Sequence, residues 1–174
     1  MKKILLCLTA LFLSSCIPVG DFGPYWDKGI IDPALLGKWN GEDKEGYGIV
    51  DKGGTYQIDT LDEREKKEKS YVPMTARTLK AGSYTFLMIK ESNKKEVIRY
   101  KIEGDVIQKY SLAPEQLSAF LLKEKYPEAK NIVFGEVHIE NFDDEVYKIL
   151  SEIPDTKKFW VPDGKYRRQT AFNN

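Results

Sequence analysis

The sequence predicts a mainly β domain of the α+β kind: an antiparallel meander that forms a barrel or half-barrel, with two helices from the C-terminal half packed on it. Three observations predict this fold class. Apolar and polar residues alternate over several short segments that recur at intervals of about 8–12 residues. Glycine, asparagine and aspartate stand between these segments, as in tight turns. Two apolar patterns with a helical period follow the meander.

The chain begins with the composition of a secretory signal. Lys2 and Lys3 precede the apolar run Ile4–Leu13, and the order Leu13-Ser14-Ser15-Cys16 follows. A signal h-region has about 7–15 apolar residues, whereas a transmembrane helix needs roughly 20. We therefore expect residues 1–15 to be a signal peptide. A secreted protein with a chance cysteine at position 16 is the alternative.

The order Leu13-Ser14-Ser15-Cys16 resembles the lipobox of bacterial lipoproteins, in which a large apolar residue and two small ones precede a cysteine. The resemblance implies that the Cys16 thiol carries a diacylglyceryl group, that cleavage occurs before this residue, and that the freed amine is acylated. It implies a lipid-anchored protein of the bacterial cell envelope. Ile17, in place of the aspartate that often marks inner-membrane retention, implies the outer membrane. Cleavage would also remove Cys7, so no disulfide is expected within the mature chain.

Residues 16–33 are rich in proline and glycine, a composition that suits a lipidated tether. Phe22, Tyr25 and Trp26 are unusual in a linker and leave open the alternative that part of this segment folds back and packs. Residues 34–174 are expected to form one domain, because no internal repeat and no second boundary follow.

The first predicted hairpin joins Gly46–Val50 to Thr55–Leu61 through Gly53-Gly54, a pair that tolerates the positive φ angles of a tight turn. Asp62–Lys69 carries four acids and four bases in eight positions and is expected to be a solvated loop or a short exposed helix. The remaining strands of the meander are expected at Tyr71–Leu79, Tyr84–Lys90, Glu96–Ile102 and Val106–Leu112.

The segment Tyr84–Ile89 is apolar on both faces, which indicates a central strand or one with a helix over its outer face. Two helices are expected to provide this cover. The first begins near Pro114 and ends before Pro127. The second has Asn141 or Asp143 as its N-cap, and carboxylates stand in its first turn, where the helix dipole stabilises negative charge. A strand is expected at Asn131–Glu140, and a short last strand at Lys158–Val161.

Gly37-Lys38-Trp39 resembles the G-x-W motif of lipocalin-like barrels. The resemblance implies that Trp39 closes one end of a barrel and that an arginine from a late strand packs across it. Arg167, Arg168 and Arg99 are the candidates. The alternative is an ordinary core tryptophan at the start of the meander. The order of meander, helix, strand and helix also resembles small bacterial lipoproteins of unassigned function.

The charge pattern and the motifs argue against nucleic-acid binding and catalysis. The chain has 27 basic and 27 acidic residues, whereas duplex binding rests on several unbalanced cations. The basic cluster Lys165–Arg168 is expected to be a solvated C-terminal segment. Glu136, His138 and Glu140 share a strand face, but one imidazole at this spacing makes a poor zinc site. No nucleophile, phosphate-binding or dinucleotide motif occurs. We therefore expect no enzyme, metal site or cofactor.

Binding and scaffolding are the classes of function that remain. The primary prediction is a membrane-anchored envelope lipoprotein that acts as a non-catalytic binding or scaffolding module for another envelope protein. The alternative is a carrier of a small apolar ligand inside the barrel. A cavity of several hundred cubic ångströms would favour the carrier, and a filled interior the scaffold. The expected ligand contacts are Trp39, Tyr47, Tyr56, Phe86 and Tyr100.

Overall fold

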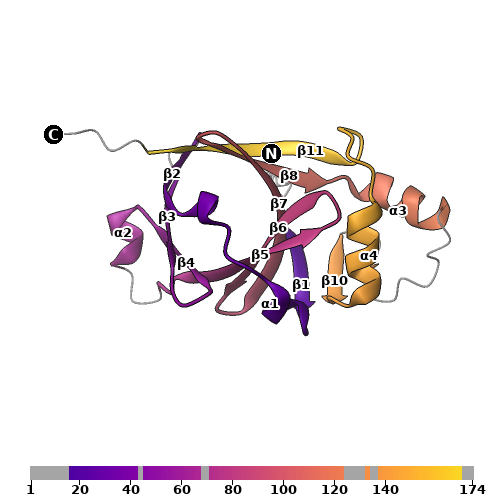
Figure 1. The fold of residues 1–174 in the computed structure, drawn as a ribbon, viewed down its shortest axis with the longest axis horizontal. Coiled ribbons are helices and arrows are strands. Elements are labelled where there is room, and N and C mark those ends of the chain that lie inside the picture. Colours follow the sequence, from indigo (N-terminus) through magenta and orange to yellow (C-terminus); the bar gives the residue numbers. More distant parts are fainter. Residues whose placement is uncertain (1–15, 43–44, 68–70, 124–131, 134–136, 170–174) are drawn as a thin grey trace, which may run out of the picture.

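The computed structural model describes residues 16–42, 45–67, 71–123, 132–133 and 137–169. Within these residues, eight antiparallel strands form a closed barrel, which Figure 1 shows end on. The predicted mainly β fold class is confirmed, and the meander closes completely. The barrel strands are β2 (Gly37–Gly41), β3 (Gly46–Asp51), β4 (Tyr56–Thr60), β5 (Met74–Ala81), β6 (Tyr84–Glu91), β7 (Lys94–Glu103), β8 (Val106–Leu112) and β11 (Trp160–Arg168).

Strand β11 closes the barrel by pairing with β8 on one side and with β2 on the other, where Arg168 lies opposite Trp39. The predicted short strand at Lys158–Val161 is therefore longer than expected. The prediction that Lys165–Arg168 is a solvated segment was wrong, because these residues belong to this closing strand. Their exposure alternates: Lys165 and Arg167 are exposed, whereas Tyr166 and Arg168 are half-buried.

A small second sheet lies outside the barrel. It contains β1 (Ile17–Asp21), β10 (His138–Asn141) and β9 (Ile132–Val133). Strand β1 links the two sheets, because it pairs antiparallel with β7 through Ile17 and Val97 and parallel with β10 through Val19 and Ile139. The single strand expected at Asn131–Glu140 is instead the antiparallel pair β9 and β10. Residues 134–136 lie outside the described residues.

The segment that follows Cys16 packs on the domain. Ile17, Val19, Phe22 and Tyr25 are all buried. After β1 come the short helix α1 (Tyr25–Lys28) and the 3₁₀ helix η1 (Pro33–Leu35). A tether was expected at residues 16–33, with packing of its aromatic residues as the alternative. The structure shows the alternative, so this segment is a structural part of the domain.

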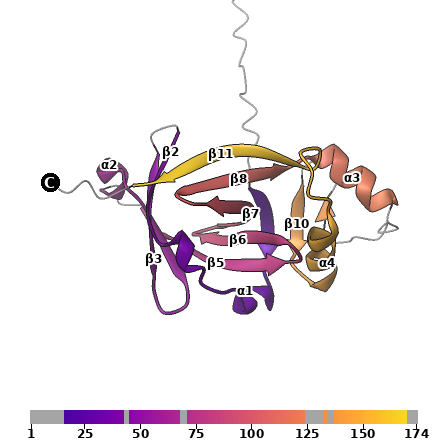
Figure 2. The same ribbon diagram turned by 45° about the horizontal axis from the view of Figure 1, so that its top comes forward.

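Two helices cover the outer face of the barrel beside the second sheet (Figures 1 and 2). Helix α3 (Pro114–Lys123) begins at the predicted proline, and residues 124–131 lie outside the described residues. Helix α4 (Asp144–Glu152) has Asp143 as its N-cap, because the Asp143 carboxylate accepts a hydrogen bond of 2.9 Å from the Val146 amide. Among the described residues, no helix has the length and apolar character needed to cross a bilayer.

The strands bury side chains on both faces and so separate two cores. On β6, Leu87 and Ile89 contact the barrel interior, whereas Phe86 and Met88 pack in the outer core beneath the helices. This alternation confirms the prediction that the segment at Tyr84–Ile89 is covered on both faces. The outer core also holds Leu117 and Leu121 from α3, Val146, Ile149 and Leu150 from α4, and Trp160.

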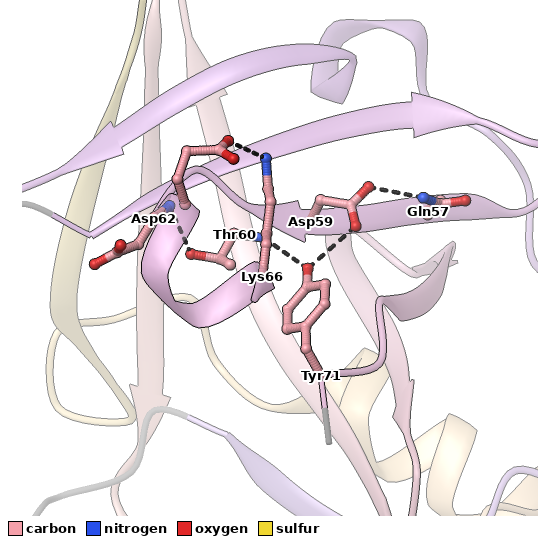
Figure 3. Close-up of polar contacts among 7 residues, drawn as sticks. Gln57, Asp59, Thr60, Asp62, Lys66 and Tyr71 are labelled. Atoms are coloured by element: carbon pink, nitrogen blue, oxygen red, sulfur yellow. Dashed lines mark hydrogen bonds and ion pairs between the residues drawn. The ribbon is translucent and has the colours of Figure 1, made fainter. Parts of the chain in front are cut away.

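The charged segment after β4 contains the short helix α2 (Glu63–Lys66), one of the two predicted forms. Tyr71 anchors the end of this segment on the outer face of β4 (Figure 3). Its hydroxyl donates to the Asp59 carboxylate at 3.1 Å and accepts a hydrogen bond of 3.0 Å from the Thr60 amide. This contact explains how a highly charged connection is held against the barrel.

Candidate functional site

The barrel interior contains a cavity of about 200 Å³. Its walls are aliphatic, because the alternate residues of five strands point inward and each contributes a branched apolar side chain. These residues are Ile49 of β3, Ile58 of β4, Leu87 and Ile89 of β6, Ile98 of β7 and Ile107 of β8. Such a wall excludes water and offers no hydrogen bonds to a ligand.

At one end the cavity is lined by Leu35 and Trp39, which are 2% and 1% exposed. The Trp39 indole donates a hydrogen bond of 2.8 Å to the Leu35 carbonyl. The guanidinium of Arg168 lies 4.2 Å from the centre of the Trp39 ring and donates to the carbonyls of Leu36 and Ala34 at 2.6 and 2.8 Å. A tryptophan under a late-strand arginine is the arrangement expected from the G-x-W pattern.

The other two candidate arginines lie elsewhere. Arg167 is exposed on β11. Arg99 is 1% exposed in the outer core, where its guanidinium lies 4.4–4.7 Å from the ring centres of Tyr84, Tyr110 and Trp160 and donates to Asp155. Of the three candidates, Arg168 therefore packs on Trp39.

A hydrogen-bond network joins three strands to the segment before β2. The Thr78 hydroxyl is 3.1 Å from the Tyr56 hydroxyl and 2.9 Å from the Tyr100 hydroxyl, and Tyr56 also donates to the Asp32 carbonyl. Burial raises the pKa of Tyr56 and that of Tyr100, so both phenols stay protonated at neutral pH. Through Tyr56 the network holds the backbone at Asp32, and through Thr78 it links Tyr56 to Tyr100.

The opposite end of the barrel holds the polar part of the cavity lining. Strand β7 ends near Arg168: its last residue, Glu103, pairs with Val106, and the neighbouring Asp105 carbonyl accepts a hydrogen bond from the Arg168 amide. The start of β7 therefore lies at the opposite end. Cys16 and Glu96 line the cavity near the start of β7, and Lys109 lines it from β8.

The lining residues differ in exposure. The half-buried ones are Cys16, Tyr47, Met74, Leu87, Lys109 and Tyr166, whereas Leu35 and Trp39 are buried. Glu96 is 8% exposed and forms an ion pair with Lys94. We infer that the cavity opens at the end of the barrel where Cys16 and Glu96 lie, because Leu35 and Trp39 cover the opposite end.

The predicted contact residues divide into three groups. Trp39, Tyr47 and Tyr100 line the cavity. Tyr56 belongs to the barrel core but uses its hydroxyl in the network with Thr78 and Asp32. Phe86 was placed wrongly, because the alternation of β6 turns it into the outer core.

Several lining residues were not predicted. Glu96 and Ile98 alternate with Tyr100 on one face of β7, so period-two patterning could have placed them in the cavity once Tyr100 was assigned to it. The position of Cys16 has no local sequence signal, because it depends on pairing between β1 and β7.

Comparison of the chain with family models, curated proteins and solved structures found no match. Among the described residues, no group of three histidine, cysteine, aspartate or glutamate side chains could hold a metal ion. Of the three residues weighed as ligands, Glu136 lies outside the described residues, His138 is half-buried and Glu140 is exposed. The cavity is chemically suited to non-covalent binding of a molecule with an apolar body and one polar end.

Proposed function

We propose that this protein is an envelope lipoprotein, tethered by lipid on Cys16, whose barrel binds one slender molecule with an apolar body and a polar end. The observation that carries this proposal is the apolar cavity inside the barrel. The volume lies between the filled interior expected of a scaffold and the several hundred cubic ångströms expected of a carrier, and the apolar space supports a carrier of a slender ligand.

The cavity volume limits the ligand. At about 200 Å³ it is larger than the roughly 150 Å³ of an engineered dry cavity that admits benzene. It is smaller than the range of about 300–1,000 Å³ that is typical of sites for drug-sized ligands. A narrow chain or the end of a longer one fits better than a broad ring system.

The distribution of polar groups sets the direction of binding. Trp39 and the aliphatic wall occupy the buried part of the cavity, whereas Lys109 and Glu96 lie toward the opening. A polar head buried against Trp39 would lose its water without gaining a partner. The apolar part of the ligand therefore enters first, and the polar part stays beside the two charged side chains.

The lipid tether is proposed on separate grounds. It rests on the basic start at Lys2-Lys3, the short apolar run, and the lipobox-like order that ends at Cys16. A lipid with more than one acyl chain gives stable membrane anchoring, whereas a single chain gives only reversible binding. Fractionation of the native protein and a Cys16→Ser variant, with the intact mass of each, tests this part.

Binding is tested with the unlipidated Cys16→Ser protein, first by native mass spectrometry after purification from its own host and then by calorimetry with dodecanoate. We expect one equivalent of dodecanoate per chain. Ile98→Phe fills the cavity and should weaken binding by at least about tenfold, equivalent to about 1.4 kcal/mol. Val50→Phe, at an exposed position of β3, is the matched control and should bind as the parent does.

Two results would contradict the carrier proposal. One is the absence of dodecanoate binding together with the absence of any co-purified small molecule. The other is equal binding by the Ile98→Phe and Val50→Phe variants, which would place the bound chain outside the barrel. Co-purification of a stoichiometric protein partner in place of a small molecule would favour the scaffolding function over the carrier function.

A further inference from the structure

The proposed lipid attachment point and the cavity opening coincide. Cys16 is itself part of the cavity lining, and the next residue, Ile17, already pairs with Val97 of β7. Pro18 lies opposite Glu96, which lines the same opening. There is thus no spacer between the residue proposed to carry the lipid and the barrel.

We propose that the ligand of the cavity is an acyl chain of the protein's own lipid anchor, which enters the barrel from Cys16. This inference rests on the proposed function, because it needs both a lipidated Cys16 and a cavity that accepts an apolar chain. It identifies the ligand of the cavity as an acyl chain that is attached to the protein itself.

Proximity favours the attached chain over any free competitor. A ligand that is covalently joined to a binding site has an effective concentration in the millimolar range when the linker is short and can span the distance. Here the linker consists of the glyceryl or amide linkage on Cys16 alone, and Cys16 already contacts the cavity. A free amphiphile would have to reach a comparable local concentration to displace the chain.

The dimensions agree with partial insertion. A methylene group occupies about the volume of a water molecule, roughly 30 Å³, so a cavity of about 200 Å³ holds about six or seven methylene groups. That is part of one long acyl chain. About the last six or seven carbons would lie inside the cavity with the terminal methyl near Trp39, and the carbons between them and the linkage would lie outside it, beside Cys16.

Membrane anchoring survives the loss of this chain. The lipid implied by the lipobox resemblance has three acyl chains, two on the glyceryl group and one on the amine. Two chains are sufficient for stable anchoring. If the third acyl chain lies in the barrel, the other two still attach the protein to the membrane. Because all three chains are attached to Cys16, the opening of the barrel then lies at the lipid surface.

Photo-crosslinking in the host tests the proposal on the lipidated full-length protein. Cells are fed a fatty acid with a diazirine near its methyl end, which is incorporated into membrane lipids and into the lipoprotein anchor. After irradiation and proteolysis, mass spectrometry identifies the linked peptides. We expect the Cys16 lipopeptide to be joined through its acyl chain to a peptide that contains Leu35 or Trp39, the lining residues beside the methyl end.

Matched variants define the specificity of the cross-link. Ile98→Phe should reduce its yield by at least about tenfold, because the ring occupies the chain's place. Val50→Phe should leave the yield unchanged, since that side chain lies on the exposed face of β3. Equal yields from the two variants would overturn the proposal.

The alternative sources of the chain give different products. A phospholipid or fatty-acid adduct on the same peptides, without Cys16, would overturn self-occupancy and leave the carrier function intact. Cross-links of the Cys16 chain confined to membrane lipids or to the barrel exterior would also overturn it. If the unlipidated protein in addition failed to bind dodecanoate, the carrier function itself would fail.

Discussion

Arg168 connects the closing strand of the barrel to the turn that precedes β2. Its guanidinium stacks on Trp39 while it donates to two backbone carbonyls and forms an ion pair of 3.2 Å with Asp105. A planar guanidinium can stack on a ring and donate in its own plane at the same time, whereas an ammonium cannot do both. The residue type is therefore specific to its position.

We expect Arg168→Lys to lower the free energy of unfolding by about 1.5–3 kcal/mol, because a hydrogen bond from a charged group contributes that much and at least one of the two is lost. The exposed ion pair with Asp105 should contribute little. Urea denaturation followed by tryptophan fluorescence measures the change. Arg167→Lys, at the exposed neighbour, should stay within about 0.5 kcal/mol of the parent, and equal losses in both variants would refute the assignment.

The sequence identified Trp39 and three candidate arginines but could not choose among them. The reason is a register shift in β11 between Pro162 and Lys165, where the strand gains one residue relative to β8. Such a bulge reverses which alternate residues point inward. Trp160 precedes it and faces the outer core, whereas Arg168 follows it and reaches Trp39. Simple alternation would have placed Arg167 there.

At the scale of elements, β1 shows why composition misled the prediction for residues 16–33. Gly20 resembles a linker glycine in the sequence, but a Cβ built at this position would lie 2.4 Å from the Glu140 carbonyl oxygen of β10. The glycine permits close approach of two parallel strands and does not confer flexibility. Only the long-range pairing of β1 with β10 reveals this, and no local pattern encodes it.

We expect Gly20→Ala to push β1 away from β10 and to destabilise the protein by about 1–3 kcal/mol, as overpacking in a well-packed region does. Gly48→Ala is the control, because its Cβ would meet only the Leu61 side chain at 3.5 Å, an ordinary contact. Chemical denaturation of both variants tests the difference. Equal stabilities of the two variants would show that the close approach is not required.

At the scale of the whole molecule, the barrel wall has a packed outer face and a partly empty inner face. Phe86 is fully buried under the helices, whereas its neighbour Leu87 lines the cavity. The sequence predicted that both faces of this strand are apolar. It could not identify the inner face, because that depends on the direction in which the whole sheet curls, and Phe86 was therefore assigned to the ligand site.

We expect Phe86→Ala to cost about 3–5 kcal/mol of unfolding free energy, because it leaves a hole in a filled core. Its affinity for dodecanoate should stay at the parent value wherever the protein remains folded. Leu87→Ala should cost less, since it enlarges an existing cavity, and it should change dodecanoate affinity. Denaturation and calorimetry on both variants measure these effects, and a loss below about 1 kcal/mol for Phe86→Ala would contradict the outer core.

The contact between Arg168 and the turn before β2 also joins two parts of the chain that are far apart in sequence. Its hydrogen bonds to Leu36 and Ala34 join residues 132 and 134 positions apart in the chain. Pairings of such long sequence separation form slowly, because a large loop must close before any contact compensates for the lost entropy. During synthesis β2 is among the first strands to appear, and β11 follows all the others. Without β11 the sheet would have two unpaired edges, at β2 and β8, and such edges favour aggregation.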